Sequence, residues 1–457
     1  MTNHNSRPPR LYVVSFNGTW AGGVLTSRKT IVSEFVKLIA DHENAVEIPL
    51  NGVGSDIGIV DRILGGVGGW GTLRNVITAL RNICKQYRRG DRIILLGYSR
   101  GAWAARYLAM LIDLVGFPED GDEHFFHLVY TACENGSLFD SRQRAVLLEN
   151  YKCWTDIQID ALCCFDTVGS LGLPLTGVAK PLQFLRGSKN SDHAVSDVAP
   201  NVKIAFHCVS LHEARAAYQP TFMGGHNVHQ VFFPGNHSHM GWIDEKEGLV
   251  HAPFAWMIQQ LHTHLGLSFD EEKLALRFPS YSLSTLAPAA TVPDANCKLT
   301  ETQIPHPFIL DRELPRWCRG HISSHNLALL FIVGKKRRRL GWVSGSGSMG
   351  RIEVHIGARL RTPLAGNDAV PGYTLMAPID GKPYWTCRQR SNRKWNWARR
   401  QTNTSLYSRG SGSSSSSYIG GENLNSSFTI TASRIEEAKV GPLEAKLLGL
   451  PQNAVAS

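Results

Sequence analysis

A serine between two glycines follows an apolar run in the first quarter of the chain. Residues 97–101 read GYSRG, after IILL at 93–96 and before an alanine-rich run with helical spacing. A turn this tight between a strand and a helix requires glycine on both sides of the serine, because a Cβ there would collide with neighbouring backbone. The hydroxyl then lies at the tip of the turn, beside a helix N-terminus that favours developing negative charge. This context predicts that Ser99 is a nucleophile.

A serine hydroxyl is too weak an acid to attack an ester unaided, so it requires a histidine base that a carboxylate holds in place. Asp166 follows the apolar run ALCCF, and His237 follows VFF within Pro-Gly-Asn-His-Ser. Both residues come just past the end of a candidate strand, in the order serine, acid, histidine that α/β-hydrolases have. We therefore predict a catalytic triad of Ser99, Asp166 and His237. The simpler alternatives are a turn-forming aspartate and a loop histidine without a partner.

The negative charge of an acyl-transfer intermediate requires two backbone N–H donors. We expect one from Arg100, because the residue after the nucleophile supplies it in hydrolases with this turn. We expect the other from the loop Asn17-Gly18, after the first candidate strand, where glycine permits a close approach of the backbone. An ordinary strand-terminating turn is the alternative for this loop.

The first 270 residues alternate strand-like and helix-like segments. Apolar runs predict strands over 11–16, 45–50, 157–165, 202–211 and 228–233, and helical spacing predicts helices over 30–39, 70–87, 122–151 and 250–265. Such alternation is typical of a mostly parallel sheet with helices on both faces. We therefore predict an α/β fold of the α/β-hydrolase type.

The composition changes after about residue 275. Residues 326–400 carry strand-like alternation, a short helix is expected at 434–449, and residues 402–427 are rich in serine and asparagine. We divide the chain into a catalytic domain, residues 1–275, and a C-terminal lid or accessory region, residues 276–457. The stretch near 402–427 is expected to be disordered, because it cannot bury enough apolar surface to offset the entropy of ordering.

One segment supplies the basic charge of the chain. Residues 301–400 hold 18 Lys/Arg and 6 Asp/Glu, a balance of +12, whereas the whole chain has +10. This region, which includes the run Lys335–Arg339, could attract an anionic membrane surface. A solvated loop is the simpler interpretation of the run. We expect an ester or lipid as the substrate, peripheral membrane contact through residues 301–400, and no nucleic acid as the principal partner.

Five motifs carry a family resemblance when they are taken in order. They are FNGTW at 16–20, GGVGGWG at 65–71, GDRIILLGYSRGAWAAR at 90–106, FDTVGS at 165–170 and FFPGNHSHMGW at 232–242. The chain resembles the α/β-hydrolase family of the phospholipase effectors of bacterial type VI secretion, in its fungal-type members, over roughly residues 10–270. The resemblance implies that Ser99, Asp166 and His237 form the triad and that phospholipid esters are hydrolysed. No cofactor is expected.

The chain departs from the family pattern at three positions near the site. The family usually has aspartate where Asn17 and His239 stand, and Asp-Glu-x-Arg where this chain reads HEAR at 212–215. Each departure replaces a carboxylate, so the resemblance predicts altered electrostatics around the histidine base.

Two other functions remain open. His226, His229, His237 and His239 could bind zinc and support metal-assisted hydrolysis, in which case chelation would abolish activity. A binding protein that keeps the fold without turnover is the other alternative, and labelling by a fluorophosphonate would count against it.

Three absences indicate a cytoplasmic protein. The nine cysteines lack paired spacing, the N-terminus has no apolar signal, and no apolar stretch is long enough to span a membrane.

Overall fold

The computed structural model describes most of the first 280 residues and parts of the rest. The described residues are 8–18, 29–39, 44–50, 68–169, 197–243, 248–278, 316–322, 334–338, 340–344, 349–350, 352–362, 369–376, 384–387, 429–431 and 434–450. The stretch 402–427, for which we predicted disorder, lies outside them. Within the described residues, none of the helices combines the length and the apolar character that a membrane span requires.

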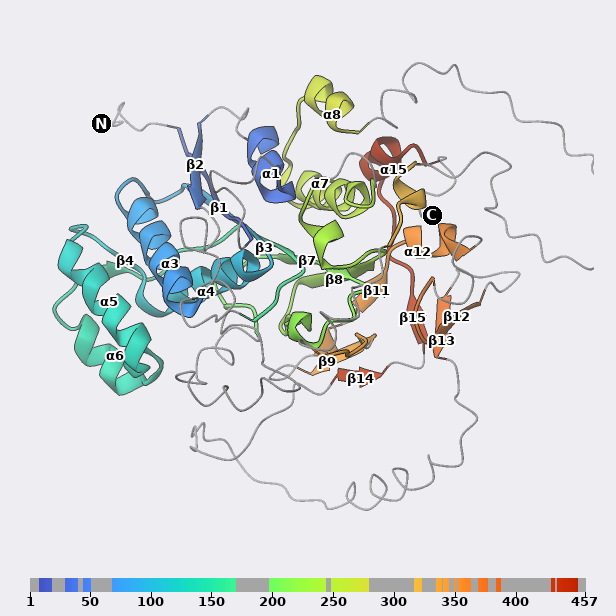
Figure 1. Ribbon diagram of the computed structural model, residues 1–457. Helices are drawn as coiled ribbons and strands as arrows, with labels where there is room; N and C mark the ends of the chain where they lie inside the picture. Colours follow the sequence, from blue (N-terminus) through green and yellow to red (C-terminus); the bar gives the residue numbers. More distant parts are fainter. Residues whose placement is uncertain are drawn as a thin grey trace, which may run out of the picture.

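Seven parallel strands form the central sheet (Figure 1). In sheet order they are β11 (Ile352–Val354), β8 (Val228–Phe233), β7 (Ala205–Ser210), β6 (Ala161–Phe165), β3 (Arg92–Tyr98), β1 (Leu11–Phe16) and β2 (Ala45–Leu50). Each strand runs parallel to its neighbours. Strands β1, β6 and β7 are buried along their whole length, which explains their continuous apolar sequences.

Helices cover both faces of this sheet, and β1 contributes alternate residues to each face. Val13 packs with α1 (Ile31–Ile39) and α7 (His251–Leu265), whereas Val14 packs with α3 (Gly68–Cys84) and α4 (Arg100–Val115). Beyond α3 lie α5 (Glu123–Asn135), η1 (Ser137–Phe139), α6 (Ser141–Leu148) and the small pair β4 (Phe117–Pro118) and β5 (Cys153–Trp154) (Figure 1). The predicted α/β-hydrolase class, with a mostly parallel sheet and helices on both faces, is confirmed.

The C-terminal third adds short elements around the β8 side of the sheet. Two three-stranded antiparallel sheets are built from β9 (Gly341–Ser344), β10 (Met349–Gly350) and β14 (Thr429–Thr431), and from β12 (Tyr373–Met376), β13 (Tyr384–Cys387) and β15 (Arg434–Glu436). The short helices of this third are α10 (Arg316–Arg319), α12 (Gly357–Leu360) and α15 (Pro442–Leu448), and α8 (Glu271–Arg277) precedes them, after α7.

The helix predicted at 434–449 is wrong in its first half. Residues 434–436 form β15, which pairs with β13, and the helix covers only Pro442–Leu448. Ile435 is buried against Trp385 between two polar neighbours, a period of two that suits a strand.

The boundary at residue 275 stays a prediction. Across it, β11 pairs with β8 in the central sheet, and α15 packs on the same face as α7.

Candidate active site

The chain turns from β3 into α4 at Ser99, with a φ of 60° and a ψ of −123°. Positive φ is rare for a residue with a Cβ and strains the backbone at the turn. The turn requires glycine at positions 97 and 101, because neighbouring backbone fills the space that a Cβ would occupy. A Cβ on Gly97 would come within 2.4 Å of Gly101 O, and one on Gly101 within 2.2 Å of Phe16 O. The turn therefore holds the hydroxyl at the carboxyl end of the sheet.

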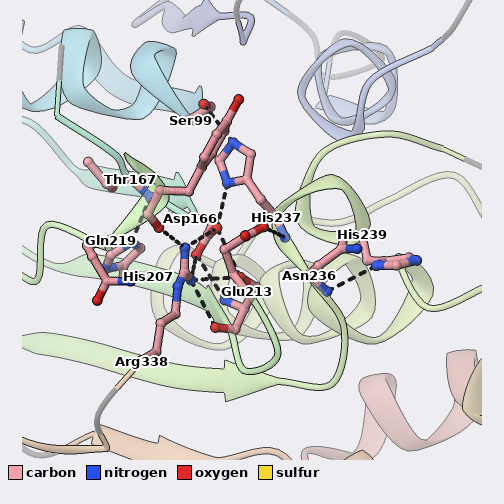
Figure 2. Close-up of polar contacts among 12 residues, drawn as sticks. Ser99, Asp166, Thr167, His207, Glu213, Gln219, Asn236, His237, His239 and Arg338 are labelled. Atoms are coloured by element: carbon pink, nitrogen blue, oxygen red, sulfur yellow. Dashed lines mark hydrogen bonds and ion pairs between the residues drawn. The ribbon is translucent and has the colours of Figure 1, made fainter. Parts of the chain in front are cut away.

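Three side chains from three strand ends form one hydrogen-bonded chain (Figure 2). Ser99 Oγ lies 2.8 Å from His237 Nε2, and His237 Nδ1 lies 2.6 Å from Asp166 Oδ2. Asp166 follows β6, and His237, the fourth residue after β8, begins the short helix η5 (His237–Met240). All three residues are buried, with exposed fractions of 6%, 5% and 0% for Ser99, His237 and Asp166. This arrangement can take a proton from the serine hydroxyl and hold it on the imidazole.

Asp166 accepts hydrogen bonds from Ser210 and Arg338 as well as from His237. Ser210 donates to it through its backbone N–H (2.9 Å) and its hydroxyl (3.1 Å), and the Arg338 guanidinium contacts both carboxylate oxygens. Burial alone would raise the pKa of Asp166, but the charge of Arg338 and the hydrogen bond with His237 hold that pKa well below its usual range. Asp166 is thus ionised, so His237 Nδ1 carries the proton of the bond between them.

Two aromatic rings and a second carboxylate fix the position of His237. The Tyr98 ring stacks on the imidazole at 5.0 Å and its hydroxyl donates to His237 O, while the Tyr218 ring meets the imidazole edge-on at 4.9 Å. Tyr218 ends the short helix η4 (Ala216–Tyr218). Glu213 accepts the His237 backbone N–H and is itself paired with Arg215 through two oxygens. The hydrogen bonds and charge of Arg215 outweigh the effect of burial and hold the pKa of Glu213 at about 2.

The expected oxyanion donors differ in what their N–H groups contact. Arg100 opens α4, where the first N–H groups of a helix have no intrahelical acceptor. Asn17 N donates to Leu50 O, so its N–H is already engaged. Gly18 is buried next to the Tyr98 ring. Arg100 and Gly18 are therefore the donors that we carry into the proposal below.

Each of the three residues that depart from the family pattern accepts a hydrogen bond, as a carboxylate would. Asn17 Oδ1 accepts from Thr30, His212 Nδ1 accepts from Gly235 N, and His239 Nδ1 accepts from Asn236 N. The last two bonds fasten the loop that carries His237. Neutral acceptors thus keep the loop geometry while removing negative charge.

A buried histidine supports the loop after Asp166. His207 Nε2 accepts the Thr167 backbone N–H at 3.1 Å, and its Nδ1 lies 3.1 Å from Gln230 Oε1. Burial, with a contribution from the Arg106 charge, lowers the pKa of His207 to about 3, so the ring stays neutral and can accept.

The sequence reasoning missed two residues of this site, His207 and Arg338. Glu213 and Arg215 were noted only as part of the HEAR run at 212–215, without a role in holding His237. His207 sits inside a strand without a local pattern that marks it, and Arg338 belongs to a basic run for which a solvated loop was the simpler interpretation. The run divides in the structure: Lys335, Lys336 and Arg337 are exposed, whereas Arg338 points inward to Asp166 (Figure 2).

Three of the four histidines that suggested zinc have separate partners. His237 contacts Ser99 and Asp166, His239 contacts Asn236, and His229 lies beside the rings of Phe206 and His264. In the described part of the chain, no three His, Cys, Asp or Glu side chains come together as metal ligands.

A family model matches more than half of the chain. The model of the catalytic domain of Tle1-like phospholipase effectors of the type VI secretion system matches residues 10–260. An uncharacterised protein of Saccharomyces cerevisiae is 28% identical over 154 residues, which cover 32% of this chain and 20% of that protein.

Two solved structures are similar to parts of the chain. The Tle1 effector bound to the VgrG spike is 17% identical, with a TM-score of 0.30 over 53% of this chain and 55% of that one. An uncharacterised protein from Pseudomonas aeruginosa is 14% identical, with a TM-score of 0.31 over 51% and 42% of the two chains. The chain thus spans about a fifth of the yeast relative and about half of each solved structure.

Proposed function

The chain belongs to the family of Tle1-like phospholipase effector catalytic domains, and on that premise we propose that it is a serine hydrolase of lipid carboxylic esters. The observation that carries the proposal is the hydrogen-bonded chain from Ser99 Oγ through His237 to Asp166, with steps of 2.8 and 2.6 Å. These distances are those that proton transfer between a nucleophile and its base requires. The family supports a phospholipase-type hydrolase, and the residue roles are part of our proposal.

The reaction has two steps. Ser99 Oγ attacks the ester carbonyl carbon while His237 Nε2 takes the hydroxyl proton, and the alcohol leaves with that proton. Water then attacks the acyl-serine ester and gives a proton to His237, which returns it to Ser99 as the fatty acid leaves. Asp166 holds Nδ1–H throughout, and the N–H groups of Arg100 and Gly18 stabilise the oxyanion of both tetrahedral intermediates.

We propose a lipid substrate and a transient contact with an anionic membrane. The exposed side chains of Lys335, Lys336 and Arg337 support this contact, because they lie on the segment that continues into Arg338 beside the site. Positive charge near a membrane surface attracts anionic headgroups over about 10 Å, and salt screens the attraction. Binding to vesicles that contain anionic lipid should therefore weaken as the salt concentration rises. The cytoplasmic location remains our expectation from cysteine usage.

The test is hydrolysis of p-nitrophenyl esters from acetate to palmitate by wild type and Ser99→Ala. We expect wild type to favour the long chains and Ser99→Ala to lose at least about 10³-fold in kcat, as serine hydrolases without their nucleophile do. Ser238→Ala removes an exposed hydroxyl next to His237 and should leave kcat unchanged. Phospholipid vesicles then identify the ester bond that is cleaved.

A fluorophosphonate probe separates the proposed enzyme from the two alternatives. The proposal requires labelling of wild type and none of Ser99→Ala. Folded wild type that neither reacts with the probe nor hydrolyses any ester would make it a binding protein. Activity that survives in Ser99→Ala but not in chelator would favour the histidine-bound metal.

A further inference from the structure

We propose that Arg338 is a positioning residue that sets the pH range of activity, by sharing the carboxylate of Asp166 with the imidazole of His237. The inference rests on the proposed function, because it concerns the same hydrogen-bonded chain. Arg338 lies 172 positions from Asp166 in the sequence and comes from the segment 334–338.

The Arg338 guanidinium is buried against the carboxylate of Asp166. Its side chain is 1% exposed, and Nη2 lies 3.0 Å from Asp166 Oδ2 while Nη1 contacts Oδ1. Nη1 also donates to Ser210 O (2.9 Å) and Ser210 Oγ (2.7 Å), and Nη2 to Tyr218 O. Both terminal nitrogens are thus committed to protein acceptors, so Arg338 acts through Asp166 and does not reach the reacting atoms.

Backbone contacts hold the segment that carries Arg338. Ala216 N donates to Gly334 O, and Lys336 N donates to Ala214 O, which pairs this segment with the loop between β7 and η4. Arg215 and Lys335 form a β-bridge in the same place. Glu213 of this loop and Tyr218 of η4 both contact His237, so the guanidinium is fixed relative to the imidazole.

The charge of Arg338 has two opposite effects on the site. It keeps Asp166 ionised despite burial, so the imidazole always has an acceptor for Nδ1–H. It also offsets the negative charge of Asp166, and a carboxylate that is paired with a guanidinium attracts an imidazolium less than an unpaired carboxylate does. The guanidinium thus weakens the attraction that Asp166 exerts on a positive charge at the imidazole, and leaves the acceptor of Nδ1–H in place.

Three ionisable groups that face His237 hold their charge over the range where an imidazole titrates. Tyr98 stays neutral because burial raises its pKa well above the ordinary value, and Glu213 stays ionised with a pKa of about 2. Arg215 is paired with Glu213 and lies over the Tyr218 ring at 3.7 Å. His212 and His239 are imidazoles that contact the backbone of the loop that carries His237, so the NMR signals of the His237 ring are needed to assign a pH-dependent change to it.

The experiment compares three variants of the full chain by the pH profile of kcat/KM. Arg338→Gln keeps a hydrogen-bond donor and removes the charge, Arg338→Lys keeps the charge, and Arg337→Gln removes the charge of the exposed neighbour. We expect the acidic limb to move up by about one pH unit in Arg338→Gln. It should stay within a few tenths of wild type in Arg338→Lys and Arg337→Gln.

A second readout does not depend on turnover. The pH at which the His237 ring signals titrate by NMR should move upward in Arg338→Gln and should not move in Arg337→Gln. The proposal is overturned if folded Arg338→Gln keeps both the wild-type acidic limb of kcat/KM and the wild-type titration of the His237 ring signals. It is also overturned if the acidic limb moves as far in Arg338→Lys as in Arg338→Gln. If Arg338→Gln fails to fold, a wild-type profile in Arg338→Lys supports the role of charge and a shifted one overturns it. Wild type without hydrolysis would overturn the proposed function, while the ring titration still decides the role of Arg338.

Discussion

Replacing Gly241 with alanine should disturb catalysis through the ring of Tyr98, although position 241 contacts none of the reacting atoms. Gly241 follows η5 with a φ of −137°, so the position does not require the left-handed conformation that favours glycine. The main obstacle to alanine is space. A Cβ at this position would lie 2.1 Å from Cε1 and Cζ of Tyr98, about 1.3 Å short of the 3.4 Å where ordinary contact begins.

The surroundings leave the Tyr98 ring little room to move away. A Cβ on Gly18 would come within 2.6 Å of the same ring, and the ring stacks on His237 at 5.0 Å. The backbone at Gly241 is also held, because its carbonyl accepts from Ile31 N and its N–H donates to Ser238 O. The ring therefore has to push against the imidazole. Overpacking of this kind costs about 1–3 kcal/mol of stability, and a misplacement of about 1 Å at a reacting group costs about 10²-fold in rate.

The assay is kcat/KM on a p-nitrophenyl ester together with the free energy of unfolding in urea. We expect Gly241→Ala to fold, to lose about 1–3 kcal/mol of stability and to lose about 10²-fold in kcat/KM. Gly266→Ala is the matched control, because Gly266 has open space around its Cβ position but a φ of +67°. It should lose about 1 kcal/mol from backbone strain and no activity. A folded Gly241→Ala with the kcat/KM of wild type would refute this reasoning.

Three further predictions concern His207, Gly101 and the histidine cluster at 226–239. His207 has a pKa of about 3 when folded and 6.5 as its reference value, so the unfolded state binds the extra proton between these values. Stability should be full above pH 6.5 and fall by up to about 1.4 kcal/mol per pH unit below it. Urea titrations at pH 7 and 5 should show a smaller loss in His207→Gln, and equal losses would contradict the assignment. Gly101→Ala should destabilise the fold by about 3 kcal/mol, measured by thermal unfolding, because its Cβ would meet backbone at Phe16. Dialysis against EDTA should leave hydrolysis intact, and activity that returns only with added zinc would favour the histidine cluster at 226–239.

Local patterns were enough to predict the sheet and the order of the three strand-end residues. The predicted bounds 11–16, 45–50 and 228–233 are those of β1, β2 and β8. Burial explains the continuous apolar sequence of β1, whereas β2, at the edge of the sheet, alternates exposed and buried residues in its second half. Ser99, Asp166 and His237 lie within hydrogen-bond distance because the carboxyl ends of parallel strands meet at one edge of the sheet.

Contacts between distant segments could not be predicted in this way. Arg338 has the same local sequence as its exposed neighbours, and only its position opposite Asp166 separates it from them. The strand at 434–436 also depends on a partner, β13, that no local pattern reveals.

The reach of Arg338 to Asp166 has a consequence for how the molecule matures. A ribosome releases Ser99, Asp166 and His237 well before it releases Arg338, which lies 172 positions after Asp166. Until Arg338 has been made, the Asp166 carboxylate has no guanidinium to pair with, although folding buries it completely. The surroundings of Asp166 are therefore completed only late in synthesis, after the segments that carry Ser99, Asp166 and His237 have been made.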